Sequence, residues 1–176
     1  MNMNKIKKSL CLTLGAMMIF SSTLTSNAAT QTGTYPTRRG VILVTPDAYK
    51  NLIPTGHAAI VWDSKNVIES LSNGVGIHKN NWRTTKNKIY GVTVTSTSAA
   101  QDSIAASWCR NQVGKGYNWN YFNVNTRQKF YCSQLVWAAY KDLYRIDLNT
   151  SLFGQAIHPM ELVNSSRTNT IYTYTR

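Results

Sequence analysis

Two hydrophobic periods follow each other along this chain, and the change between them falls near residue 98. Before that point, short runs rich in β-branched residues stand between glycine, proline or polar turns, a pattern typical of strands. These runs predict strands at residues 40–46, 57–63, 66–72 and 88–97. The short polar turn between the middle two predicts a hairpin. Residues 74–80, GVGIHKN, extend this sheet or form a loop.

After residue 98 the apolar positions recur at helical spacing. Ser98 and Gln101 have the spacing of a capping box, and Gly114 is typical of a helix end. The apolar face of this first helix would comprise Ile104, Ala105, Trp108 and Cys109. A second helix is predicted to begin at or just after Cys132, with Leu135, Val136, Ala139 and Leu143 on one face. A short helical segment follows around Pro159, and residues 169–176 alternate as a last strand.

The order of these elements indicates the fold class. Strands come first, helices follow and one strand returns, which is typical of an α+β fold with an antiparallel sheet and helices packed on one side. Residues 115–128, rich in asparagine and aromatic residues, lack a period and are predicted as a loop. The sequence contains no internal repeat and no low-complexity tract.

The first 29 residues have the layout of a secretory signal peptide. Three lysines precede an apolar run of 11 residues, and small residues end the segment at Ala28 and Ala29. The apolar run is shorter than the about 20 residues that a membrane-spanning helix needs. We therefore predict a signal peptide at 1–29, a flexible lead-in at 30–39, and one domain at 40–176 of an exported protein.

Charge narrows the partners of this domain. Without the three lysines of the leader, 16 basic and 7 acidic side chains remain, a net charge of +9. Such a charge favours an anionic setting such as the cell envelope, and nucleic acid is disfavoured for an exported protein. The cations are scattered and also fit an ordinary solvated surface.

Cys132 is the residue whose position most clearly indicates chemical reactivity. At a helix start, unpaired backbone N–H groups and the positive end of the helix dipole favour a thiolate. The same N–H groups could receive the negative charge that develops on a carbonyl oxygen during acyl transfer. Cys109, late in its helix on the apolar face, is predicted to be a buried core thiol. A disulfide between the two is the alternative.

A catalytic thiol needs a base and an orienting partner. His57 begins a strong strand directly after Gly56 and is the favoured base, with His158 and His78 as alternatives that fit capping or surface roles better. Glu69 lies in the strand expected to pair with that of His57, where a charge is costly unless it has a partner. Asp63 and Asp47 are predicted to be turn residues, and Glu69 could instead face water at an edge.

The motifs GHAAIVW, NVIESLSNGVGIH, GKGYNWNYF and FYCSQLVWAAY, in this order, resemble the YiiX/YebB-like branch of the NlpC-type cysteine hydrolases. The resemblance spans residues 40–165 and implies a circularly permuted papain-like fold, with the histidine before the cysteine. It implies Cys132 as nucleophile, His57 as general base and Glu69 as the third member.

The resemblance also concerns residues around the cysteine. Tyr117 matches the family's aromatic residue after glycine and would line the cleft; Tyr131 and Ser133, beside the cysteine, are further candidate substrate contacts. One departure is Gln134, where many relatives have glutamate. If the side chain faces solvent, this change is harmless. If it faces the substrate, the change could alter a substrate contact.

These features predict a monomeric, exported hydrolase that cleaves a peptide or acyl-amide bond in cell-wall peptides or lipid-linked conjugates. Two alternatives stay open: a non-catalytic wall- or lipid-binding module that uses the aromatic loop, and an acyltransferase on the same scaffold. No cofactor is expected, and the scattered histidines and cysteines do not have the spacing of a metal site.

Overall fold

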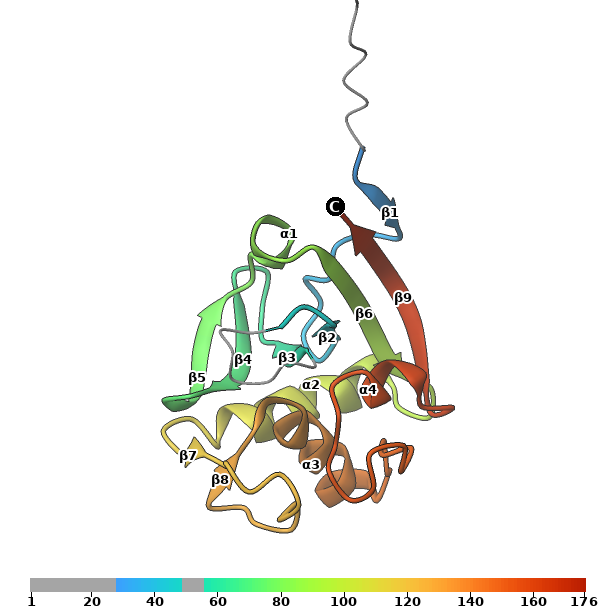
Figure 1. Ribbon diagram of the computed structural model, residues 1–176. Coiled ribbons are helices and arrows are strands. Elements are labelled where there is room, and N and C mark those ends of the chain that lie inside the picture. Colours follow the sequence, from blue (N-terminus) through green and yellow to red (C-terminus); the bar gives the residue numbers. More distant parts are fainter. Residues whose placement is uncertain (1–27, 49–55) are drawn as a thin grey trace, which may run out of the picture.

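The computed structural model describes residues 28–48 and 56–176. In this part of the chain, a seven-stranded antiparallel sheet has the order β1-β9-β6-β2-β3-β4-β5 (Figure 1). The strands are β1 (Thr30–Thr32), β2 (Ile42–Thr45), β3 (His57–Val61), β4 (Asn66–Leu71), β5 (Gly74–Lys79), β6 (Lys88–Val94) and β9 (Thr168–Thr175). The four strands and the hairpin predicted before residue 98 are confirmed, residues 74–80 extend the sheet, and the last predicted strand is β9.

Helices form the second layer. The two long helices, α2 (Ala99–Arg110) and α3 (Cys132–Tyr144), pack against each other and against β3 and β4. Figure 1 shows both helices across one face of the sheet. The remaining elements are the short helices α1 (Trp82–Thr85) and α4 (Glu161–Asn164) and the small parallel pair β7 (Gly116–Tyr117) and β8 (Lys129–Phe130). The predicted α+β arrangement is confirmed.

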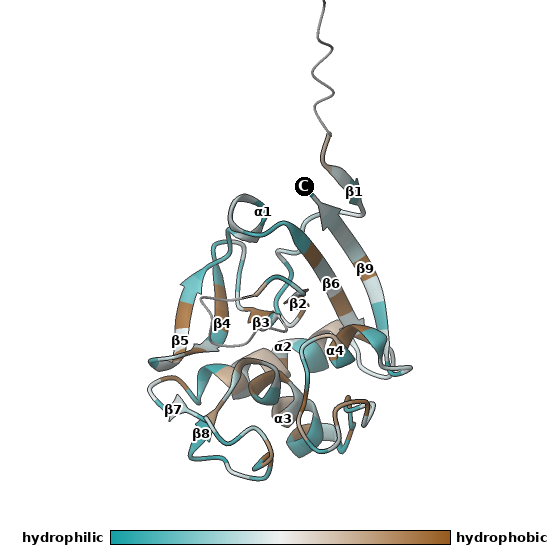
Figure 2. Ribbon diagram, in the orientation of Figure 1, coloured by the Kyte–Doolittle hydropathy of each residue, from teal (hydrophilic) through white to brown (hydrophobic). Residues whose placement is uncertain are grey.

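Apolar side chains are buried on both faces of the central strands. One core lies between the sheet and the helices, and Figure 2 shows hydrophobic segments of β3, β6, α2 and α3 where these layers meet. A second, smaller core lies on the other face and includes Leu43, Ala59, Val67, Trp82 and Tyr172. Because both faces are covered, all five residues of β3 are buried. This explains why β3 has a continuous apolar run rather than an alternating one.

Residues 30–39 are more ordered than the predicted lead-in. Thr30–Thr32 pair with the end of β9, and the hydroxyl of Tyr35 donates a hydrogen bond to Asn80 at 2.6 Å. The ring of Tyr35 also packs edge-on against Tyr172. These partners lie more than 40 residues away in the sequence, so the local pattern contained no sign of them.

The predicted face of α2 is partly wrong. Ser98 and Gln101 form the expected capping box, and Ala105 and Cys109 are buried. However, Ile104 is 52% exposed, and Asp102 faces inward instead. The Asp102 carboxylate is tolerated there because Arg38 pairs with it at 3.0 Å and the hydroxyls of Thr97 and Tyr140 donate to it. Within residues 28–48 and 56–176, none of the helices combines the length and apolar character needed to cross a bilayer.

Candidate active site

Cys132 is the first residue of α3, as predicted. The preceding residue, Tyr131, is extended and serves as N-cap, so the cysteine stands where the helix N–H groups lack partners within the helix. The sulfur is buried and accepts backbone N–H groups from Ser133 and from Ala58 in β3. The site therefore joins the start of the helix to the start of a strand.

His57 is the first residue of β3 and forms a side-chain hydrogen bond with Cys132. The chain enters this strand through Gly56, which has a φ of +110°. A Cβ at Gly56 would collide with the carbonyl oxygen of Thr45, the register partner of His57. Glycine is therefore required for the turn that places the imidazole against the thiol.

Glu69 is the second partner of His57. Its Oε2 lies 2.6 Å from Nε2 of the imidazole, and both side chains are buried. A water-facing role for Glu69 is therefore excluded. Cys132, His57 and Glu69, predicted from three separate segments, form one continuous hydrogen-bonded chain.

The electrostatics of this chain favour a thiolate–imidazolium pair. Burial opposes the thiolate, but the charge and hydrogen bond of His57 and the two backbone N–H groups lower the pKa of Cys132 below its ordinary value. Burial also disfavours the imidazolium, yet Cys132 and then Glu69 raise the pKa of His57 to about 9. Burial opposes ionisation of Glu69, but His57 and His78 lower its pKa to about 2. The arrangement thus favours the thiolate, which is the nucleophilic form of cysteine.

The other two histidines have different surroundings. His158 accepts the backbone N–H of Met160 at 3.1 Å and stacks on Phe153, so it caps the short turn before α4 as predicted. His78, expected in a weakly structured stretch, lies in β5 with Nδ1 3.2 Å from Oε1 of Glu69. The predicted surface role of His78 is therefore wrong.

Trp82 is a site residue that the sequence analysis missed. Trp82 is the first residue of α1. Its ring stacks on the imidazole of His57, with the ring centroids 5.6 Å apart and an angle of 30° between the ring planes. The indole packs against one face of the base, and both side chains are buried. Nothing in the polar stretch around Trp82 indicated this contact, which depends on α1 folding over the sheet.

The three candidate substrate contacts have different environments. The pKa of Tyr117 is raised by burial and then by the charge on Cys132, so its side chain is near the sulfur. The hydroxyl of Tyr131 accepts from the backbone N–H of Ile157 and donates to the carbonyl of Tyr121. Ser133 donates to the carbonyl of Ile157. Both hydroxyls are hydrogen-bonded to the loop at Ile157, and Tyr117, Tyr131 and Ser133 stay candidate substrate contacts.

Gln134 is fully buried, so the hypothesis of a solvent-facing side chain is wrong. Its amide oxygen accepts from Asn118 and from the backbone of Tyr131. Its amide nitrogen donates to the carbonyls of Asn123 and Val124, at 3.3 and 3.1 Å. The amide therefore fixes the aromatic loop to the start of α3, and this role requires a donor.

We expect Gln134→Glu to destabilise the protein by about 1–3 kcal/mol, because a carboxylate cannot donate to the two loop carbonyls. Urea unfolding should show a lower midpoint. Gln128→Glu, at an exposed loop position, is the matched control and should unfold like the wild type. A Gln134→Glu midpoint equal to that of the wild type would contradict this role.

Cys109 is a core residue. It is buried, its sulfur lies 3.7 Å from the carbonyl oxygen of Leu135, and burial raises its pKa strongly. Both Cys109 and Cys132 are free thiols, so the alternative of a disulfide between them is wrong. Of these two cysteines, only Cys132 has the environment of a nucleophile.

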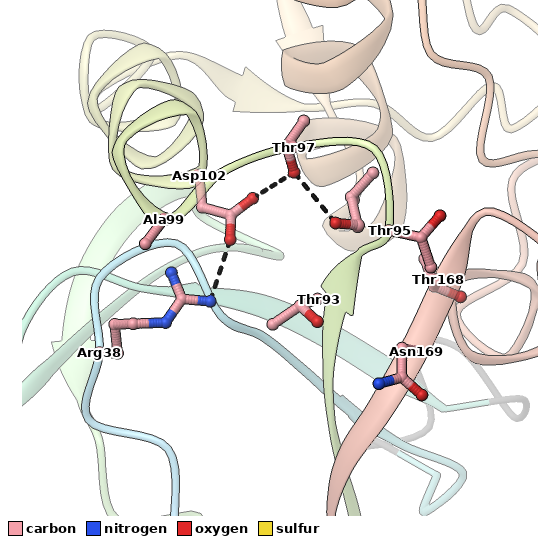
Figure 3. A pocket seen from close by; sticks show the side chains of 9 residues that line it. Arg38, Thr93, Thr95, Thr97, Ala99, Asp102, Thr168 and Asn169 are labelled. Atoms are coloured by element: carbon pink, nitrogen blue, oxygen red, sulfur yellow. Dashed lines mark hydrogen bonds and ion pairs between the residues drawn. The ribbon is translucent and has the colours of Figure 1, made fainter.

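Two pockets lie near charged groups. One, of about 230 Å³, borders Glu69, His78, Trp82 and Lys86, directly beside the histidine–glutamate pair. The other, of about 450 Å³, opens between α2 and the ends of β6 and β9 and contains Arg38 and Asp102 (Figure 3). In the second pocket the carboxylate of Asp102 is already bound by Arg38 and Thr97, which gives it a structural role.

Comparison with protein families identifies the chain. A family described as "Permuted papain-like amidase enzyme, YaeF/YiiX, C92 family" matches residues 44–172, a segment that includes Cys132, His57 and Glu69. The chain belongs to this family. The predicted relationship and the permuted papain-like fold are thereby confirmed, and the family is one of cysteine amidases.

One solved structure agrees with this assignment. It is described as the metalloprotein yiiX from Escherichia coli O157:H7, with a TM-score of 0.59 and 15% identity over 77% of this chain and 96% of that one. At this identity the likeness shows the fold alone. A comparison with curated proteins gave no match. Within residues 28–48 and 56–176, histidine, cysteine and acidic side chains do not gather in groups of three that could hold a metal ion.

Proposed function

We propose that this permuted papain-like amidase family member is an exported thiol hydrolase that cleaves an amide bond through a thioester. The observation that carries the proposal is the hydrogen-bonded chain from Cys132 through His57 to Glu69. A buried thiol with a lowered pKa, bonded to an imidazole that a buried carboxylate orients, is the arrangement used in nucleophilic acyl transfer.

In the proposed reaction, the Cys132 thiolate adds to the amide carbonyl and forms the carbon–sulfur bond. The N–H groups at the start of α3 would stabilise the oxyanion. His57 gives its proton to the leaving amine as the carbon–nitrogen bond breaks, leaving a thioester. The imidazole then takes a proton from water, the hydroxide displaces the sulfur, and the acid product leaves with the thiolate restored.

The substrate is proposed to come from the cell envelope. The predicted leader and the net charge of +9 of the remaining chain support an anionic extracellular setting. Peptidoglycan peptides and lipid-linked amides both fit this setting. Because Cys132 is buried, with Tyr117 near its sulfur, the proposal favours a substrate whose scissile amide is slender enough to reach the thiol.

A substrate panel tests the proposal. We expect purified protein to release amine from either peptidoglycan-derived peptides or N-acyl amide lipids, and mass spectrometry of quenched reactions should find the acyl group on Cys132. Cys109→Ala is the matched control, because that thiol is buried in the core against the carbonyl oxygen of Leu135. Turnover of a panel member by the Cys132→Ala variant at the wild-type rate would refute the mechanism.

Exposed aromatic residues favour one other function, a binding module for wall or lipid. Trp119 and Phe122 are 54% and 69% exposed in the loop that begins at Tyr117. Aromatic rings beside cations suit sugars and membrane interfaces. Thiol reactivity separates the two functions, because a binding module does not require a lowered pKa at Cys132. An added amine acceptor that intercepts the acyl group in place of water would instead indicate acyl transfer.

A further inference from the structure

The carboxylate of Glu69 lies between two imidazoles. His57 approaches Oε2 at 2.6 Å from β3, and His78 approaches Oε1 at 3.2 Å from β5. Each carboxylate oxygen therefore has its own histidine. A catalytic chain of cysteine, histidine and glutamate uses only the first of these contacts, so the second requires its own explanation.

The strand register explains how His78 reaches the carboxylate. Glu69 is paired directly with Gly76, and His78 is two residues further along β5 on the same face. Its contact with Glu69 is thus a diagonal one across the pair of strands. A Cβ added at Gly76 would lie 2.7 Å from Cε1 of His78, closer than a real contact allows. The imidazole occupies the space that a side chain at Gly76 would fill.

The burial of the contact indicates that it is specific. Glu69 is 7% exposed, and the Nδ1 atom of His78 is buried although about a third of its side chain faces solvent. The 3.2 Å contact is an ion pair and does not have the alignment of a hydrogen bond, so Glu69 Oε1 is the polar group that this nitrogen faces. A buried nitrogen facing a carboxylate oxygen must carry a proton, since two lone pairs would repel each other. The outer edge of the ring borders the pocket of about 230 Å³ and can exchange protons with water.

We propose that His78 is a positioning residue that holds the Glu69 carboxylate ionised and aimed at His57, and so sustains the Cys132 thiolate in acid. The inference rests on the proposed function of Cys132. It assigns the second histidine an indirect role, since His78 contacts neither the sulfur nor the base.

The charges around Glu69 set the sign of the pH dependence. They are His57 from β3, His78 and Lys79 from β5, and Lys86 from the segment after α1. The contact with Glu69 raises the pKa of His78 above its ordinary value. Below that raised pKa the ring is charged and supports the carboxylate. As pH rises through it, this contribution is lost.

Two variants separate the contact from the mere presence of the ring. His78→Gln removes the charge, whereas Gly76→Ala keeps His78 but places a methyl group where its ring lies. Gly116→Ala is the matched glycine control, because a Cβ there meets no atom within 4 Å. Alkylation of Cys132 by iodoacetamide in the full chain, read at the Cys132 peptide by mass spectrometry, measures the thiolate without any substrate.

We expect both variants to be alkylated about fivefold more slowly than the wild type at about pH 5, with rates that converge by about pH 9. Gly116→Ala should follow the wild type throughout. Profiles of both variants that coincide with the wild type, or a loss that is equal at every pH, would overturn the inference. Failure of the proposed function is seen separately, as hydrolysis that survives Cys132→Ala, because alkylation does not depend on turnover.

Discussion

The Cys132→Ala variant is expected to lose amide hydrolysis by a factor on the order of a thousand or more, because the nucleophile itself is removed. The fold should persist, since alanine suits the first turn of α3 and the loss is one sulfur atom. Initial rates on the substrate identified from the panel, together with circular dichroism, measure both outcomes.

Cys109→Ala separates this effect from the loss of a buried thiol in general. Its sulfur is in the core, so the variant should lose some stability but keep its rate per folded molecule. Retention of the wild-type rate by Cys132→Ala, or an equal loss in both variants, would remove Cys132 from the mechanism.

The second large effect is expected for Glu69→Gln, which keeps the shape of the side chain and removes its charge. We expect the hydrolysis rate to fall on the order of a hundredfold or more, because the imidazole loses the carboxylate that orients it. Glu69 is also one of the groups that raise the pKa of His57 to about 9. Without it the imidazolium is lost at lower pH.

The pH profile tests this prediction. In the wild type, activity should rise as the Cys132 thiol ionises and fall as His57 loses its proton near pH 9. In Glu69→Gln the alkaline fall should move to lower pH. Asp142 lies at the end of α3 opposite to Cys132, and its carboxylate is paired with Arg127. Asp142→Asn should therefore leave the pH profile unchanged. An unmoved alkaline limb in Glu69→Gln would contradict the role of the carboxylate.

Local patterns predicted most of the regular elements but not their distant partners. Capping at Ser98 and the start of α3 depend on a few neighbouring residues, so the sequence indicated them directly. The pairing of Thr30–Thr32 with β9 joins the two ends of the domain, and no local period predicts such a contact. The sequence predicted that Ile104 faces inward, but Asp102 does so instead. The buried carboxylate is tolerated because Arg38, 64 residues away, compensates its charge.

The site shows the same limit. Cys132 and His57 stand at the starts of a helix and a strand, and Glu69 is a charge inside an apolar strand, so each was visible alone. The role of His78 was predicted wrongly because its contact with Glu69 is diagonal across two strands and needs a glycine at position 76. The burial of Gln134 could not be decided from the sequence, because the partners of its amide lie in a loop without a period.

The central claim is that His57 holds the sulfur of residue 132 as a thiolate near neutral pH. The direct measurement is the ultraviolet absorbance of thiolate across a pH titration, taken as the difference between the wild type and Cys132→Ala. We expect one thiolate that appears below the ordinary pKa of a cysteine and whose pKa shifts upward in a His57→Ala background. A thiolate that appears only at or above the ordinary value, or one unchanged by loss of the imidazole, would contradict it.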